Sequence, residues 1–187
     1  RQMCIRDSFS TFDLPISIIR PFNTYGPRQS SRAVIPSIIT QIAAGKKNIN
    51  LGALSPTRDF NYVEDTCNAF IAISESQKTI GKVINSSSNF ELSIGETLNL
   101  ITKIMNTDVN IITEEDRLRP NKSEVNRLFG DNSLLLELTK WDSKFVGLDG
   151  FKRGLKLTID WFSSPSNLKY YNPYKSVSYT NLTLQTN

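Results

Sequence analysis

The sequence predicts an α/β protein, because short apolar segments rich in β-branched residues alternate with segments whose apolar residues recur at helical spacing. Turn residues, chiefly Gly, Pro and Asn, separate these segments. The chain has 187 residues, of which 39% are apolar and 21% charged, and this composition is typical of a globular chain. We expect one domain, or part of one.

The first predicted elements are a strand and a helix. Ile16–Arg20 is a run of the buried-strand type and leads into a loop that contains Pro, Asn and Gly. A helix follows, because four isoleucines recur at i, i+3, i+4 and i+7: Ile35, Ile38, Ile39 and Ile42. Gly45 can end this helix, and its apolar face is expected to pack in the core.

A second helix is predicted between two further strands. Phe60–Val63 and Lys82–Asn85 have the residue types of short strands. Asp65 is the expected N-cap of the helix between them. The apolar residues of that helix are Ala69, Phe70 and Ile73.

The third predicted helix has the most specific start signal. Ser93 and Glu96 have the spacing of a capping box. Apolar residues then continue along one helical face: Ile94, Leu98, Ile101 and Met105.

One strand and two helices are expected in the remainder of the second half. Val109–Ile112 is a predicted strand, and Asp131 is the expected cap of a helix over Leu134–Leu138. The apolar face of a last helix comprises Leu148, Phe151, Leu155, Ile159 and Phe162. Beyond Ser163 the sequence is polar and contains Pro and Tyr, so no further element is expected.

Charge and cysteine content exclude several classes of function. The net charge of +4 is small, and its basic residues are spread among acidic ones, so no nucleic-acid partner is expected. The chain has no His, and Cys4 and Cys67 have no metal-ligand or disulfide pattern. No apolar run approaches the roughly 20 residues of a membrane helix. These features favour a soluble protein of the reducing cytoplasm, without metal.

Both ends of the chain have unusual sequences. Residues 1–8, RQMCIRDS, resemble translated sequencing-adapter read-through, and so do residues 177–187, VSYTNLTLQTN. The alternative is that both are natural polar termini. In either case we expect the fold to lie between them.

The segment Arg20–Arg28, RPFNTYGPR, is the first candidate for a ligand site. Open α/β sheets bind ligands beyond the carboxyl ends of their strands, where this segment is predicted to lie. Asn23 can donate and accept hydrogen bonds, while Gly26 and Pro27 favour a tight turn. Without further information, the residues favour a plain strand exit with Asn in a turn, and a ligand site is the alternative.

Three ordered motifs carry a resemblance to a known family. RPFNTYGPRQS, then LGALSPTRDFNYVEDTCNAF, then RLRPNKSEVNRLFGD resemble motifs of the nucleotide-sugar epimerases and dehydratases of the extended short-chain dehydrogenase/reductase family. The resemblance covers residues 9–162. In detail the motifs look most like NAD-dependent 4,6-dehydratases that act on nucleotide-linked N-acetylglucosamine (a UDP or GDP sugar) in legionaminic acid synthesis.

The resemblance implies a fold and a division of the chain. It implies the last strands and helices of a Rossmann-type parallel sheet plus a small α/β substrate-binding domain. Residues 9–90 would form the C-terminal part of the NAD-binding domain, with interleaved substrate-binding segments. Residues 91–165 would form the nucleotide-sugar-binding domain, and residues 166–176 a tail. The full-length enzyme would be a homodimer.

The resemblance also implies roles for residues of the first two motifs. Phe22 would lie beside the nicotinamide and Asn23 on the sugar diphosphate. Four residues would line the nucleotide pocket, the last two near the base: Ala33, Val34, Ile49 and Leu51.

Three charged residues complete the implied site. Arg58 matches an arginine that contacts the diphosphate, which suits the bidentate guanidinium fork. Arg119 would add a second cation, and Glu124 would hold the ribose hydroxyls. The alternatives are a surface ion pair of Arg58 with Asp59 and an i, i+3 helix pair of Glu124 with Arg127.

Two features of the family's active site have no counterpart in this sequence. No Gly-rich turn of the G-x-x-G-x-x-G type occurs. Tyr171–Lys175 has Tyr-x-x-x-Lys spacing, but Pro173 argues against the helix that such a catalytic pair needs. We therefore expect a C-terminal fragment without catalytic residues, whose acid/base pair lies upstream of Phe9.

The resemblance implies a lyase as the full-length function. With bound NAD it would oxidise the sugar at C4, eliminate water across C5 and C6, and return the hydride to C6. A nucleotide-sugar 4-epimerase is the alternative within the family. A non-catalytic nucleotide-sugar-binding module is the alternative from another class.

Overall fold

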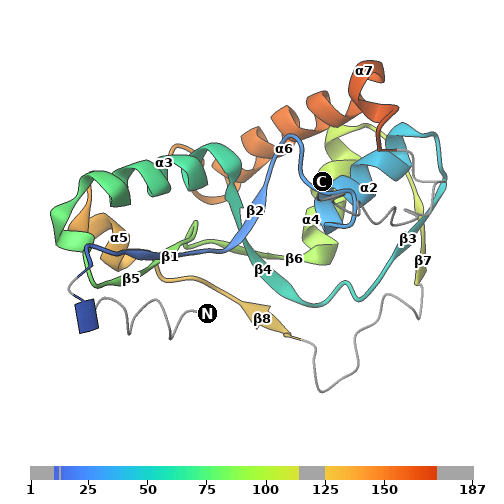
Figure 1. Ribbon diagram of the computed structural model, residues 1–187. Helices are drawn as coiled ribbons and strands as arrows, with labels where there is room; N and C mark the ends of the chain where they lie inside the picture. Colours follow the sequence, from blue (N-terminus) through green and yellow to red (C-terminus); the bar gives the residue numbers. More distant parts are fainter. Residues whose placement is uncertain (1–10, 13, 114–124, 172–187) are drawn as a thin grey trace, which may run out of the picture.

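The computed structural model describes residues 11–12, 14–113 and 125–171, and they form the predicted α/β fold (Figure 1). Their strands are β1 (Ile18–Pro21), β2 (Asn23–Tyr25), β3 (Asn48–Leu51), β4 (Thr57–Tyr62), β5 (Val83–Ser86), β6 (Glu91–Ser93), β7 (Asn110–Thr113) and β8 (Arg127–Leu128). The helices are α2 (Val34–Ala43), α3 (Val63–Glu75), α4 (Ile94–Ile104), α5 (Ser133–Leu138), α6 (Gly147–Ser163) and α7 (Pro165–Leu168), and a 3₁₀ turn covers Gln77–Thr79. The two terminal segments with adapter-like sequences lie outside the described residues.

One end of the molecule contains a pair of parallel strands. β1 pairs with β5 in the register Ile18 to Val83, and α3 and α5 lie beside this pair (Figure 1, left). A small apolar cluster holds these elements together: Ala69, Ile73, Ile84, Leu135 and Trp141. Parallel pairing with a helical cover is typical of α/β sheets.

The centre of the molecule is built around β4. Its second half pairs in parallel with β2, so that Asn23 lies opposite Phe60. Its first half has two neighbours, because Thr57 lies opposite Ser93 of the antiparallel β6 and opposite Arg127 of the parallel β8. β4 therefore connects segments that are far apart in the sequence.

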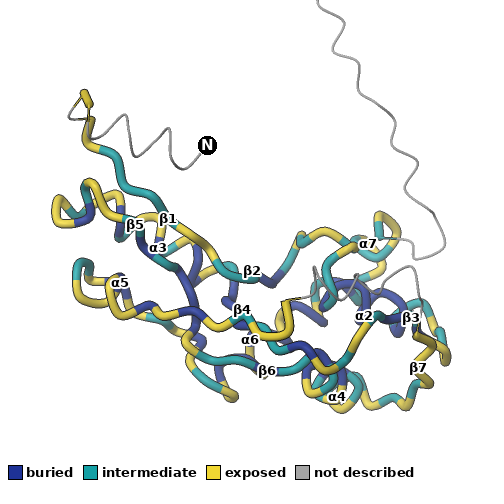
Figure 2. Tube along the Cα trace, turned by 90° about the horizontal axis from the view of Figure 1, so that it is seen from below, coloured by how far each residue is buried: buried dark blue, intermediate teal, exposed yellow. Residues whose placement is uncertain are grey.

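Helices α2, α4 and α6 pack against one another at the other end, where β3 pairs in parallel with β7. α2 is buried along most of its length (Figure 2), which agrees with the predicted isoleucine face. Gly45 follows this helix with φ of 78°, the left-handed conformation expected of a helix stop. No helix in the described ranges is long and apolar enough to cross a membrane.

An aromatic cluster joins the central strands to α6. The ring of Tyr25 lies 5.4 Å from that of Tyr62 and 5.2 Å from that of Phe151, measured between centroids. Its hydroxyl donates to the carbonyl of Phe151 (3.2 Å). Burial raises the pKa of Tyr25, and the nearby Tyr62 and Asp65 raise it further. Tyr25 therefore acts here as a neutral packing residue with one satisfied hydrogen bond.

The predicted strand exit at the first motif differs from the observed one. The chain leaves β1 at Pro21 and then forms β2, so Asn23 lies in a strand instead of a loop. Phe22 lies between these two strands, and its N–H donates to the carbonyl of Ser86 at the end of β5 (2.9 Å). The turn comes only at Gly26, whose φ is 146°. The short β2 was missed because its partner β4 is remote in sequence.

The predicted role of Asp65 as a helix cap is wrong. α3 begins at Val63, and Asp65 lies in its first turn with a fully buried side chain. Its carboxylate accepts hydrogen bonds from the Ser143 hydroxyl (2.7 Å) and from the N–H groups of Lys144 and Phe145 (2.9 Å each). It therefore joins α3 to the segment before α6.

The later helices agree with their predictions except at their ends. The capping box of α4 is present, with both hydrogen bonds between Ser93 and Glu96. Asn132, not Asp131, occupies the N-cap position of α5, although the Asp131 carboxylate accepts from the N–H of Ser133 (2.9 Å). The chain after α6 adds α7, which its polar composition did not predict.

Candidate functional site

A pocket of about 580 Å³ lies where β2, the start of α2, the end of β3 and the first half of β4 meet. Five residues of the predicted site line it: Asn23, Ala33, Val34, Leu51 and Arg58. They come from positions up to 35 residues apart in the sequence. The fold therefore brings together residues that the resemblance had implied one by one.

Asn23 forms part of the polar wall of the pocket. It opens β2, and its side-chain NH₂ donates to the carbonyl of Asp59 on β4 (3.3 Å). This bond fixes the amide beside the backbone of the neighbouring strand. Its carbonyl oxygen is of a kind that can accept a hydrogen bond from a ligand hydroxyl.

Arg58 supplies a cation on the same wall. Its Nη1 donates to the carbonyl of Thr57 (2.8 Å) and to that of Val125 (2.6 Å), just before β8. These bonds hold the guanidinium beside the segment that leads into β8. A guanidinium presents several N–H donors in one plane and can bind the oxygens of an anion.

The start of α2 adds positive potential to the pocket. Arg32, Ala33 and Val34 line the pocket, and α2 has neither a side-chain cap nor an acidic residue in its first turn. Helix N-termini carry partial positive charge and attract anions. Among the described residues that line the pocket, none is acidic. The electrostatics therefore suit an anionic ligand.

Part of the pocket lining is apolar and is held by a buried amide. Leu51, Gly52 and Ala53 follow from β3 into the pocket lining. The Gln41 side chain accepts from the N–H of Asn50 (2.9 Å) and donates to its carbonyl (3.3 Å). The Gln41 side chain thus bonds both backbone groups of Asn50, as a neighbouring strand would. These bonds hold the end of β3 and the lining residue Leu51 in place.

Two predicted residues do not line this pocket. The Ile49 side chain is fully buried in the core below β3. Phe22 lies at the carboxyl end of β1, where a Cβ on Gly130 would come within 2.9 Å of its ring. Arg119 and Glu124 lie outside the described residues.

Sequence reasoning missed two polar residues of the pocket, Gln29 and Arg32. Both line it, and the Gln29 amide donates to the carbonyl of Thr24 (2.7 Å). They lie directly after the RPFNTYGPR motif. Their position between a predicted strand end and a predicted helix start was the available signal.

The two alternatives considered for the charged residues do not fit the structure. Asp59 is fully buried and accepts four hydrogen bonds, so it is no surface partner of Arg58. Arg127 lies in β8, not in a helix, and bonds the Glu91 carboxylate through Nε and Nη2. The hydrogen bonds from Arg127 and then from Thr57 lower the pKa of Glu91.

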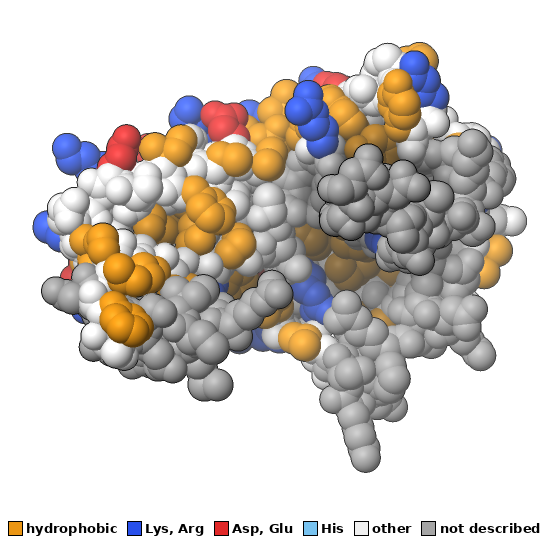
Figure 3. Space-filling model, viewed as in Figure 1, with side chains coloured by type: hydrophobic (Ala, Val, Ile, Leu, Met, Phe, Trp, Pro, Cys, Tyr) orange, Lys and Arg blue, Asp and Glu red, His pale blue; other side chains and the backbone are white. Residues whose placement is uncertain are grey.

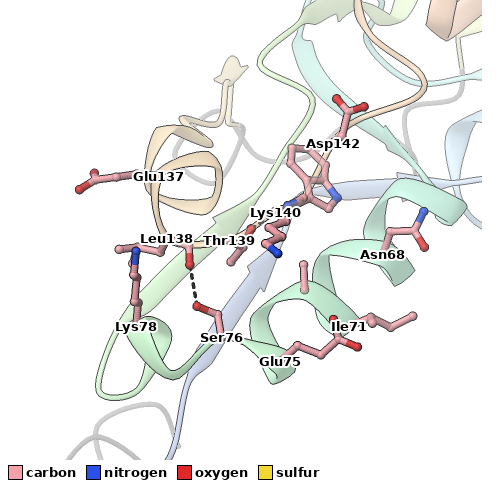
Figure 4. A pocket seen from close by; sticks show the side chains of 12 residues that line it. Asn68, Ile71, Glu75, Ser76, Lys78, Glu137, Leu138, Thr139, Lys140 and Asp142 are labelled. Carbon is pink, nitrogen blue, oxygen red and sulfur yellow. Dashed lines mark hydrogen bonds between the residues drawn. The ribbon is translucent and has the colours of Figure 1, made fainter.

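A second pocket, of about 610 Å³, lies between α3 and the segment that follows α5 (Figure 4). Its charged side chains have both signs, among them Glu75, Asp142 and Lys140. The Ser76 hydroxyl donates to the Leu138 carbonyl across its floor (2.6 Å). It contains none of the predicted site residues and no concentration of one charge, so we assign the ligand site to the first pocket.

Comparisons with known proteins agree with this fold and these motifs. The family described as GDP-mannose 4,6-dehydratase matches residues 2–153. The chain is 31% identical over 159 residues to UDP-N-acetyl-alpha-D-glucosaminuronate decarboxylase of Bacillus cytotoxicus, covering 82% of this chain and 48% of that protein. It is 28% identical over 170 residues to human dTDP-D-glucose 4,6-dehydratase, covering 84% and 44%.

A solved structure of a related enzyme has a similar fold. UDP-glucuronic acid 4-epimerase of Bacillus cereus, in complex with UDP-glucuronic acid and NAD, superimposes with a TM-score of 0.75 at 25% identity, covering 86% of this chain and 49% of that one. The chain spans about half the length of the relatives that it matches. It belongs to the GDP-mannose 4,6-dehydratase family, within the nucleotide-sugar dehydratases and epimerases of the extended short-chain dehydrogenase/reductases.

Proposed function

We propose that the pocket between β2, β4 and α2 binds the nucleoside diphosphate part of a nucleotide sugar. The observation that carries this proposal is the convergence of Asn23, Arg58 and the uncapped start of α2 on one pocket, whose described lining residues include no acidic one. A diphosphate needs several charge-assisted donors close together. The apolar wall at Leu51 offers a surface for the base.

We further propose that the natural protein, meaning the full-length protein to which this chain belongs, is an NAD-dependent nucleotide-sugar 4,6-dehydratase, a lyase. NAD, when bound, supplies the temporary oxidation of the sugar that makes elimination of water possible. The residues of this chain bind and orient: Arg58 and Arg32 hold the diphosphate, and Asn23 holds the adjoining sugar end. Fixing the hexose in this way favours a near-attack geometry.

The residues present fit only a small part of a nicotinamide site. Phe22 lies at the carboxyl end of β1, where open α/β sheets bind their ligands, and its ring could pack beside a nicotinamide. The sequence has no Gly-rich turn for the pyrophosphate. We therefore assign to this chain the substrate side of the reaction.

The finer substrate assignment rests on the sequence motifs. RPFNTYGPRQS, SPTRDFNYVEDT and RPNKSEVNRL look most like dehydratases of legionaminic acid synthesis, so we propose UDP- or GDP-N-acetylglucosamine as the substrate. Arg119 and Glu124 belong to the third of these segments and are proposed to contact the diphosphate and the ribose.

A 4-epimerase is the second candidate, because of the structural likeness to the UDP-glucuronic acid 4-epimerase. Product analysis on the natural protein separates the two. A dehydratase yields a 4-keto-6-deoxy sugar with loss of one water, whereas an epimerase yields an isomer of unchanged mass. If the natural protein binds the nucleotide sugar and yields neither product, the non-catalytic binding module gains support.

The binding proposal is tested with Arg58→Ala in the natural protein. The change removes charge-assisted hydrogen bonds worth roughly 1.5 to 3 kcal/mol each, so affinity for UDP or GDP should fall about tenfold or more by calorimetry. Added salt should narrow the difference between variant and parent, because it screens the anion.

Arg153→Ala is the matched control, since Arg153 lies on α6, stacks on Phe145 and does not line the pocket. It should bind UDP and GDP as the parent does. Equal binding by Arg58→Ala and the parent would show that the pocket is not the diphosphate site.

A further inference from the structure

Asp59 is a charged side chain of β4 that the proposed binding function leaves unexplained. It lies between Arg58 and Phe60, both of which line the pocket, but it is itself fully buried. Its Oδ1 accepts from the N–H and the hydroxyl of Ser88 (2.8 and 2.7 Å). Its Oδ2 accepts from the N–H groups of Asn89 (3.1 Å) and Gly130 (3.2 Å).

These four hydrogen bonds join three separate segments. Ser88 and Asn89 belong to the turn between β5 and β6, and Gly130 follows β8. Asn89 has φ of 55°, a left-handed conformation that its bond to Asp59 helps to hold. Because β6 and β8 flank the two edges of β4 at Arg58, the carboxylate fastens both neighbours of that residue.

Both polar groups of the pocket depend on this arrangement. Arg58 is held by the Val125 carbonyl, which leads into β8, while Gly130 fixes the other end of the same segment. Asn23 donates to the backbone carbonyl of Asp59 itself. A shift of Asp59 would therefore move the Arg58 guanidinium and the Asn23 amide, both of which line the pocket.

We propose that Asp59 is a positioning residue of the site, which sets Arg58 for the diphosphate and Asn23 for the adjoining sugar end without touching the ligand. This inference rests on the proposed binding function. A carboxylate is required because three backbone N–H groups and a hydroxyl converge on it, and only an acceptor without N–H groups satisfies them all. Asparagine has the same shape but would turn an NH₂ toward the N–H groups of Asn89 and Gly130.

A double-mutant cycle tests the proposal in the natural protein. The variants are Asp59→Asn, Arg58→Ala and the two combined, with calorimetric binding of UDP and GDP at a temperature well below every unfolding midpoint. We expect Asp59→Asn to weaken binding about fivefold or more in the parent and less than about twofold when Arg58 is already Ala. Lost stability alone would not produce this dependence on Arg58.

Asp65→Asn is the matched control. Asp65 is an equally buried carboxylate that accepts hydrogen bonds from remote backbone N–H groups, but it faces the segment before α6 and does not line the pocket. It should lower the unfolding midpoint and leave nucleotide affinity unchanged.

The outcomes separate this inference from the function on which it rests. Unchanged affinity in Asp59→Asn, or an equal loss with and without Arg58, overturns the positioning role while the binding function stands. If Arg58→Ala itself binds as the parent does, the binding function fails and the positioning role fails with it. If Asp59→Asn does not fold, Ser88→Ala takes its place, because it removes one of the four hydrogen bonds. It should weaken nucleotide binding about twofold in the parent and less when Arg58 is Ala. Unchanged nucleotide affinity in Ser88→Ala would overturn the inference.

Discussion

Asp59 and Asp65, six residues apart, both use a buried carboxylate to gather hydrogen-bond donors from remote segments. The donors to Asp59 lie 29 to 71 residues away, and those to Asp65 lie 78 to 80 residues away. The sequence therefore offered no local sign of either network. Asp59 suggested an ion pair with the adjacent Arg58, and Asp65 suggested a helix cap. Burial raises the pKa of Asp59, and the hydrogen bonds from Ser88, Gly130 and Asn89 oppose that rise.

At this scale we predict that Asp65→Ala destabilises the protein. It leaves the N–H groups of Lys144 and Phe145 and the Ser143 hydroxyl without their acceptor, so the free energy of unfolding should fall by about 3 kcal/mol in urea denaturation. Asp149→Ala is the control, because the Asp149 side chain is 97% exposed on α6. A change equal to that of the control would mean that water replaces the Asp65 bonds.

Helices and strands differ in how far the sequence predicts them. α4 and α6 follow from a local capping box and from apolar periodicity, and both appear as expected. β2, β6 and β8 have only two or three residues, and their paired residues in β4 lie 32 to 70 positions away, so nothing local marks them. Of these strands, β2 contributes Asn23 to the pocket lining, while β6 and β8 pair with the part of β4 that carries Arg58.

The capping box of α4 should make part of the stability depend on pH. Hydrogen bonds from the hydroxyl and the N–H of Ser93 lower the pKa of Glu96 below its usual 4.5. The lowered pKa means that this contribution is present above the pKa of the unfolded chain and is lost as the pH falls through that of the folded chain. The unfolding midpoint of Glu96→Gln should therefore fall less than that of the parent between about pH 6 and about pH 3.

Ser93→Ala provides the control for this experiment. It removes both the hydroxyl donor to Glu96 and the acceptor for the Glu96 N–H, so it should flatten the same part of the pH profile. A parent-like profile in both variants would assign the acid dependence to other carboxylates.

At the scale of the whole molecule, the described residues form two apolar clusters, one around β1 and β5 and one under α2, α4 and α6. Composition and alternation predicted the α/β class. The residues alone predicted only Arg20–Arg28 as a ligand site, and the family resemblance added Ala33, Val34, Leu51 and Arg58 of the pocket lining. Physical patterns could not supply them, because Leu51 and Arg58 become neighbours of Asn23 only when β3 and β4 return to β2.

The β1 end of the molecule presents apolar side chains at its surface. Phe70 and Ile71 on α3 are about half exposed, at 48% and 54%, and apolar side chains gather over this end of the molecule (Figure 3, left). β1 has β5 as its single strand partner among the described residues. An apolar surface beside an open strand edge favours association.

We therefore predict that the 187-residue chain, purified alone, binds a hydrophobic fluorescent dye and self-associates in light scattering. Replacing both Phe70 and Ile71 by Ser should reduce dye binding, because it removes two exposed apolar side chains and changes no buried residue. Leu148→Ser on α6 is the control for a similarly exposed apolar residue at another place and should change dye binding less. A monodisperse parent without dye binding would mean that this apolar surface is covered within the chain itself, since water alone would leave it open to the dye.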